Sequence, residues 1–99
     1  MKIGTTPRHT FTLPFSTDGI DEIEIMYSQN GKNKLRKTKD DCALGGNEIV
    51  CQLTQEDTFQ FCGNAIVSIQ LRVRTNTGEV LASDIISRPC MSCLSKEVL

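Results

Sequence analysis

The stretch NAIVSIQLRVRTNTGEVLASDII, residues 64–86, decides the fold class of this chain. Apolar and polar residues alternate from Val67 to Val73, and a period of two is typical of a β-strand that buries one face. The Asn-Thr-Gly that follows, ending at Gly78, predicts a three-residue hairpin loop with this glycine in the left-handed conformation. The stretch therefore predicts two antiparallel strands whose apolar side chains belong to a core.

This loop sets the predicted register of the hairpin. Counting outward from the loop, Val73 faces Leu81 and Ile69 faces Ile85, so apolar residues meet across the two strands. The second strand is predicted to run without interruption over residues 79–87.

Two loop geometries compete in EIEIMYSQNGKNKLRK, residues 22–37. The Asn-Gly dipeptide favours a two-residue type I′ turn, but that register places Ile25 opposite Arg36. A three-residue loop that includes Gln29 instead places Ile25 opposite Leu35. Because a slip of one residue turns side chains to the wrong face, we predict the three-residue loop.

Turn residues divide the rest of the chain into further short strands. Leu-Gly-Gly-Asn, residues 44–47, predicts a turn in which both glycines have positive φ and Cys42 faces Ile49. HTFTLPF, residues 9–15, alternates as far as Pro14, which is expected to end the strand because it lacks an N–H group. We predict strands over residues 9–13, 22–28, 33–38, 41–44, 47–53, 65–75 and 79–87.

One segment departs from the strand pattern. Thr54 precedes Gln-Glu-Asp, as an N-cap precedes acids in a first helical turn, and predicts one or two helical turns over residues 55–60. Short strands joined by tight loops predict an all-β fold, an antiparallel immunoglobulin-like β-sandwich of about seven strands with one short helical turn. We expect a single domain over residues 1–87 and a C-terminal tail over residues 88–99.

Composition excludes several classes of protein. Eleven Lys and Arg residues against twelve Asp and Glu residues give a net charge of −1, which argues against a surface wholly committed to nucleic acid or anionic lipid. The first residues, MKIGTTPRHTFTL, lack the apolar run of a signal peptide, and no stretch approaches the roughly 18 apolar residues of a membrane span. We expect no secretion through a signal peptide and no membrane contact.

Five cysteines and one histidine are the candidate metal ligands. Cys90 and Cys93 form a CxxC motif, which can hold half of a tetrahedral zinc site or act as a redox pair. A second CxxC is absent, Cys51 lies on the apolar side of its predicted strand, and His9 has no nucleophile beside it. We therefore expect free thiols, with no metal site, no cofactor and no catalytic residue. Because nucleophile elbows, phosphate loops and HExxH pairs are also missing, we predict that the protein is not an enzyme.

Two polar surfaces could bind a partner. The hairpin arm over residues 32–39 is the most basic window of the chain and could contact phosphates, although lysines on a solvated edge strand that resists aggregation are commoner. The polar face of the strand over residues 65–75 offers the second surface. The predicted interaction surface comprises Lys34, Arg36, Lys37, Gln70, Arg72 and Arg74.

The order of these motifs resembles a known family. TTPRHTFTLPF, IDEIEIMYSQNGK, a basic strand, LTQEDTFQF and VSIQLRVRTNTGEVLASDII follow one another between residues 3 and 87. This series resembles a family of small proteins encoded by bacteriophages and prophages of Gram-positive bacteria. Those proteins are similar in layout to the immunoglobulin-like N-terminal domain of phage baseplate upper proteins, which anchors a receptor-binding organelle to the tail.

The resemblance implies a function in protein contact. We expect a noncatalytic phage structural module, associated with the tail or baseplate, whose partners are other phage structural proteins or further copies of itself. It would then reside in the virion or in the bacterial cytoplasm. The alternative is a small intracellular binding or regulatory protein that uses the basic arm, residues 32–39, on nucleic acid or on an acidic partner.

Overall fold

A computed structural model describes all 99 residues and contains eight strands, one short α-helix and two 3₁₀ turns. The predicted all-β class is confirmed, with eight strands in place of seven. The strands are β1 (Arg8–Thr12), β2 (Ile20–Gln29), β3 (Lys32–Thr38), β4 (Cys42–Gly45), β5 (Glu48–Gln52), β6 (Ala65–Thr75), β7 (Val80–Ala82) and β8 (Ile86–Cys90). The helical segments are η1 (Thr17–Gly19), η2 (Lys39–Asp41) and α1 (Gln55–Thr58).

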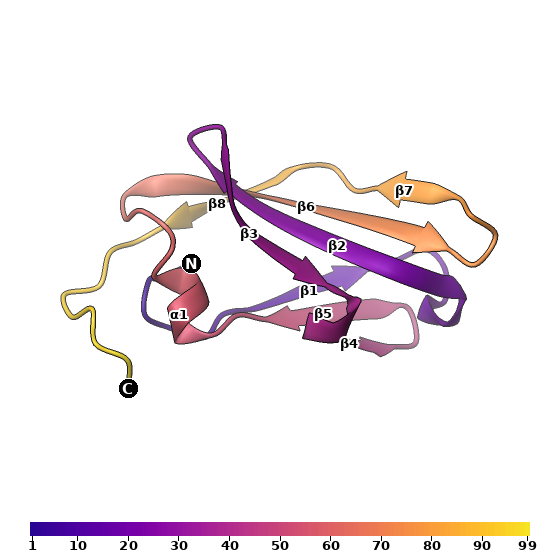
Figure 1. Cartoon of the computed structure of the whole chain (residues 1–99), viewed down its shortest axis with the longest axis horizontal. Coiled ribbons are helices and arrows are strands. Elements are labelled where there is room, and N and C mark those ends of the chain that lie inside the picture. The colour runs from indigo at the N-terminus through magenta and orange to yellow at the C-terminus, as the bar shows by residue number, and fades with distance from the viewer.

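The strands form two antiparallel sheets, seen as two layers in Figure 1. One sheet has three strands in the order β1-β5-β4. The other has five, in the order β3-β2-β6-β7, with β8 also paired to β6. The molecule is elongated and measures 46 × 28 × 17 Å. None of its helical segments is long and apolar enough to cross a membrane.

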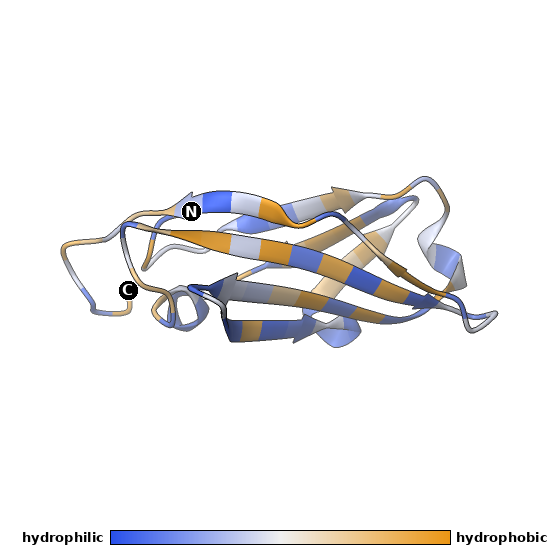
Figure 2. Cartoon of the chain, turned by 90° about the horizontal axis from the view of Figure 1, so that it is seen from above, coloured by the Kyte–Doolittle hydropathy of each residue, from blue (hydrophilic) through white to orange (hydrophobic).

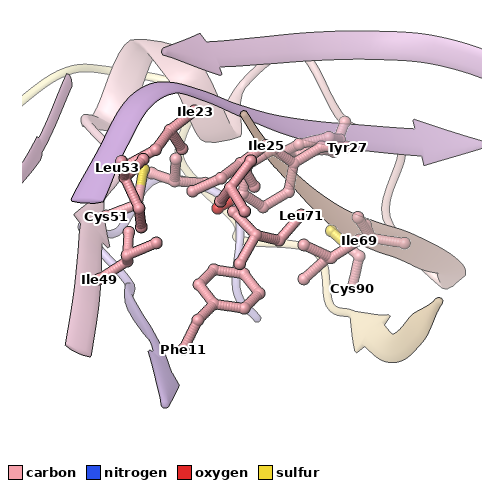
Figure 3. Packing of buried hydrophobic residues seen from close by; sticks show 14 residues of the cluster. Phe11, Ile23, Ile25, Tyr27, Ile49, Cys51, Leu53, Ile69, Leu71 and Cys90 are labelled. Carbon is pink, nitrogen blue, oxygen red and sulfur yellow. The ribbon is translucent and has the colours of Figure 1, made fainter. Parts of the chain in front are cut away.

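A single apolar core lies between the sheets because each strand alternates, as Figure 2 shows by the hydropathy of successive residues. The four apolar residues of the alternating stretch in β6 are all buried, which confirms that they belong to the core. From the facing sheet, Phe11, Ile49 and Cys51 join the same cluster (Figure 3). The core comprises Phe11, Ile20, Ile23, Ile25, Tyr27, Ile49, Cys51, Leu53, Phe61, Val67, Ile69, Leu71, Val73 and Cys90.

The β6–β7 hairpin has the predicted register near its loop. Val73 pairs with Leu81, and Gly78 has a φ of 89°. The prediction of one strand over residues 79–87 is wrong, because the pairing breaks after β7 and Ile69 faces Ile86 in β8. The break occurs at Ser83, whose hydroxyl accepts a hydrogen bond from the N–H of Leu71 at 3.0 Å. This hydroxyl takes the place of the backbone carbonyl that would accept the bond in a regular strand pair.

The predicted three-residue loop between β2 and β3 is also wrong. Gln29 pairs with Lys32, and the two loop residues between them both have positive φ, as a type I′ turn requires. A β-bulge then inserts Lys34, so that Tyr27 faces Leu35. The bulge reconciles the turn preference of Asn-Gly with apolar pairing, whereas the prediction treated the two as exclusive.

The β4–β5 turn lies one residue further along than predicted, which shifts the pairing of the two strands by two residues. Gly45 pairs with Glu48, and of the two glycines only Gly46 has positive φ. Cys42 consequently faces Cys51 rather than Ile49. A shift of two residues keeps every side chain on its predicted face, so the core pattern survives the error.

Helix α1 begins as predicted. The Thr54 hydroxyl accepts from the N–H of Asp57 at 3.1 Å, and the Asp57 carboxylate accepts from the N–H of Thr54 at 2.9 Å, forming a capping box. The helix ends at Thr58, two residues before the predicted end.

The last strand continues beyond the predicted domain boundary. Residues 88–90 belong to β8, and Cys90 is buried in the core, so these residues of the predicted tail are part of the folded sheet instead. A short parallel pairing with residues 1–3 continues the sheet past β8. In it, the N–H of Ile3 donates to the carbonyl of Met91 at 3.0 Å, and the N–H of Met91 donates to the carbonyl of Met1 at 2.9 Å.

Candidate interaction surface

The outer face of the five-stranded sheet, opposite the core, carries a cluster of paired charges. Register places two acids of β2 directly opposite two arginines of β6. The Arg72 guanidinium lies 2.8 Å from Glu24, and the Arg74 guanidinium lies 3.0 Å from Glu22. Opposite charges at facing positions stabilise an antiparallel sheet modestly, by roughly 0.2–1 kcal/mol per pair.

A third arginine joins this cluster from the edge strand β3. The Nε of Arg36 donates to Oε2 of Glu24 at 2.8 Å, while Arg72 binds the other carboxylate oxygen. The hydrogen bonds from Arg36 and Arg72 hold the pKa of Glu24 below its ordinary value. The charged cluster, defined as Glu22, Glu24, Arg36, Arg72 and Arg74, surrounds a shallow hollow of about 170 Å³.

Replacing Glu24 with glutamine should lower the free energy of unfolding at neutral pH by at most about 1 kcal/mol, because both ion pairs are solvent-exposed. A lowered pKa in the folded state means that this stabilisation is complete above the unfolded pKa and is lost as pH falls through the folded one. Urea unfolding across acid pH should therefore show wild type and variant converging. Glu48→Gln, on an exposed β5 position, is the control. A difference that stays constant with pH would contradict this assignment.

Lys37 does not belong to this surface. It pairs with the buried Ile25, so its side chain lies on the core side of β3, and its Nζ is 2.8 Å from Oδ2 of Asp57 in α1. Their side chains are only 15% and 12% exposed. Burial disfavours the charged form of both side chains, but each partner stabilises the charge of the other. Asp57 holds the pKa of Lys37 above its ordinary value. Lys37 and the N–H of Thr54 hold the pKa of Asp57 below its ordinary value.

Two other predicted surface residues have different surroundings from the arginines. Gln70 is half-buried, and its amide donates to the carbonyl of Ser83 at 3.0 Å, which positions the link between β7 and β8. Lys34 is the half-buried residue of the bulge and forms no salt bridge. Of the six predicted residues, the structure thus brings Arg36, Arg72 and Arg74 together.

The basic arm has less free charge than its sequence indicates. Arg36 and Lys37 are in salt bridges, and Lys39 donates from Nζ to the carbonyl of Ile20 at 2.9 Å. Lys32 and Lys34 remain without an acidic partner. A surface that binds phosphates needs several cations free to approach them, and here most of the cations are already engaged.

The thiols and the histidine are dispersed among different environments. Cys90 is buried while Cys93 is exposed, so the CxxC motif does not present two thiols to solvent. The Nδ1 of His9 lies 2.8 Å from the Tyr27 hydroxyl, and burial lowers the pKa of this histidine. No group of three or more His, Cys, Asp or Glu residues has an arrangement that could hold a metal ion.

Sequence reasoning missed the contact of Glu24 with Arg72 and the contact of Asp57 with Lys37. Glu24 contacts two arginines at once, and Asp57 holds Lys37. Pairing the acidic alternation of β2 with the basic alternation of β6 would have found the first contact, whereas nothing local indicates the second. Comparison with known proteins adds no further assignment: neither a protein-family model, nor a curated protein, nor a solved structure matches the chain.

Proposed function

We propose that this protein is a noncatalytic, immunoglobulin-like interaction module of a phage particle, which contacts other tail-associated structural proteins or further copies of itself. The observation that carries the proposal is the strand order. The orders β1-β5-β4 and β3-β2-β6-β7 correspond to strands B-E-D and C′-C-F-G of a variable-type immunoglobulin sandwich. The three connections β1–β2, β3–β4 and β5–β6 cross between the sheets, as they do in that topology.

The phage assignment rests on the sequence resemblance over residues 3–87. A sandwich of this kind hosts many functions, so the role must come from its surface. The outer face of the five-stranded sheet supports a role in protein contact. It carries exposed apolar side chains beside the charged cluster.

The apolar part of this face lies at one end of β6. Ile66 is 62% exposed and pairs with Pro89 of β8, and the two line a shallow hollow of about 310 Å³ with Met91. Val80 of β7 is also exposed, as is Ile85 in the link between β7 and β8. Apolar groups rimmed by polar ones are typical of protein contact surfaces. We infer that the partner protein covers this face.

Binding to purified tail proteins tests the proposal. The full chain should associate with them, or with itself at high concentration, in analytical ultracentrifugation, and Ile66→Asp should abolish the association because a charge would be buried at the contact. Thr10→Asp, on an exposed position of the three-stranded sheet, is the matched control and should bind normally. A monomer that binds no tail protein would overturn the proposal. Salt-dependent binding of DNA, lost on charge reversal at Lys32 and Lys34, would favour the regulatory alternative instead.

A further inference from the structure

Two cysteines face each other across the β4–β5 hairpin. Cys42 pairs with Cys51, and both side chains lie on the core side of the three-stranded sheet. Cys51 is fully buried, whereas Cys42 is half-buried and so the more accessible of the two residues. The Cys42 thiol donates a hydrogen bond to the carbonyl of Thr38 at 3.4 Å.

The backbone hydrogen bonds show whether Cys42 and Cys51 form a hydrogen-bonded or a non-hydrogen-bonded pair of the antiparallel sheet. The N–H of Leu53 donates to the carbonyl of Pro7, and the N–H of Leu13 donates to the carbonyl of Asn47. In an antiparallel pair such bonds recur at every second residue, so between Asn47 and Leu53 every second residue of β5 bonds to β1. By this alternation Cys51 directs its backbone groups toward β1 and away from β4. The N–H of Cys42 likewise points elsewhere, to the carbonyl of Lys39.

Cys42 and Cys51 therefore form a non-hydrogen-bonded pair, in which the side chains approach most closely. Facing Cα atoms in such pairs are about 4.5 Å apart. Disulfides span Cα separations of roughly 4.4–6.8 Å, so the backbone can accept a bond between these residues without moving far.

Neighbouring groups favour loss of one proton from the pair. The nearby Cys42 thiol, Tyr27 hydroxyl and Lys37 ammonium lower the pKa of Cys51 against the effect of burial. The same coupling raises the pKa of Cys42. The lowered pKa of Cys51 favours its attack in the second step of an exchange reaction, in which it would displace a small thiol from Cys42.

We propose that Cys42 and Cys51 are a thiol–disulfide exchange site, which forms a reversible cross-strand disulfide with low-molecular-weight disulfides such as oxidised glutathione. Cys42, the less buried of the two, loses its proton to solvent and attacks one sulfur of the small disulfide as a thiolate, which breaks the S–S bond of that disulfide. A mixed disulfide forms on Cys42, and the first small thiol leaves with the proton that Cys42 gave to solvent. The Cys51 sulfur then attacks the Cys42 sulfur, and the second small thiol leaves with the proton of Cys51. One disulfide is reduced to two thiols while two protein thiols become one disulfide, so electrons and protons balance.

The other thiols provide an internal competitor for this reaction. Cys62 and Cys93 are both exposed and line one hollow of about 570 Å³ between the residues after α1 and those after β8. Their segments touch at Gly63, where an added Cβ would collide with Ser92. Exposure alone therefore predicts that Cys62 and Cys93 react first, whereas the strand register predicts a bond between Cys42 and Cys51.

Disulfide mapping of the folded, full chain tests the proposal. The protein is equilibrated with oxidised glutathione at neutral pH, its remaining thiols are alkylated, and it is cut after glutamate, because Glu48 separates Cys42 from Cys51 and Glu56 separates Cys51 from Cys62. The expected result is a fragment pair joined through Cys42 and Cys51, lacking two hydrogen atoms and released by dithiothreitol. The Cys62→Ser/Cys93→Ser variant should give the same pair.

Three outcomes would overturn the inference. In the first, Cys42 and Cys51 are both alkylated in full after equilibration. In the second, glutathione stays attached to Cys42 because Cys51 does not displace it. In the third, the bond forms only between Cys62 and Cys93. Each is read on wild-type protein, so none depends on the stability of a variant.

Discussion

Replacing Asp57 with alanine is expected to lower the free energy of unfolding by about 3 kcal/mol, because it breaks a largely buried ion pair. The Lys37 ammonium would stay in a position where its side chain is 15% exposed, with no counter-charge at 2.8 Å. The change also removes the acceptor for the N–H of Thr54 in the capping box. Urea denaturation at neutral pH measures the loss.

A double-mutant cycle separates the ion pair from the cap. Lys37→Met should destabilise less when Asp57 is already alanine, because the lysine it removes is then unpaired. Glu22→Ala is the control, since its ion pair with Arg74 is exposed to solvent. Equal losses for Asp57→Ala and Glu22→Ala, or strictly additive effects of Lys37→Met and Asp57→Ala, would show that the buried pair contributes nothing of its own.

The pH range over which the Lys37–Asp57 ion pair stabilises the protein depends on the pKa values of both side chains. The pKa of Asp57 is lowered in the folded state, so its contribution is lost as pH falls through that value. The pKa of Lys37 is raised, so its contribution is complete below the unfolded value and is lost as pH rises through the folded one. The stability difference between wild type and Asp57→Ala should therefore be greatest between these limits and narrow on both sides.

Ile25→Ala is expected to cost about 3 kcal/mol as well, because it opens a cavity in a core that cannot close around it. The Ile25 side chain is 0% exposed and lies in β2, a central strand of the five-stranded sheet. Thermal and urea unfolding measure the loss. The matched control is Ile66→Ala on the outer face, which should change stability by no more than about 0.5 kcal/mol. Similar losses at the two positions would contradict the assignment of core and outer face.

The sequence predicted those parts of the fold that depend on alternation and capping. The buried face of β6 follows from a period of two, and Thr54 marks the start of α1 from a local pattern. Loop registers failed where two local preferences conflict. At Asn30 and Gly31 the chain adopts the two-residue turn that these residues favour. A β-bulge then restores the apolar pairing of Tyr27 with Leu35, and no single residue of the sequence indicates that bulge.

The candidate surface was only partly predictable for a related reason. The outward direction of Arg72 and Arg74 follows from alternation along one strand, and the structure places both arginines in the charged cluster. Lys37 was assigned to the surface from its charge alone, although alternation from its neighbour Arg36 already places it on the opposite, core-facing side of β3. Its partner in α1 comes from a separate segment, and such a contact depends on how the sheets pack.

The parallel pairing of residues 1–3 with Met91 has a consequence for how the molecule folds. The Met1 ammonium donates to the carbonyl of Pro89 across 88 positions of sequence, so this contact closes nearly the widest loop that the chain contains. Contacts of such separation carry a high entropic cost until the intervening strands are in place. The amide hydrogens of Ile3 and Met91 should thus gain protection from exchange last during refolding. Protection of these two amides from exchange would therefore report when all the strands have assembled.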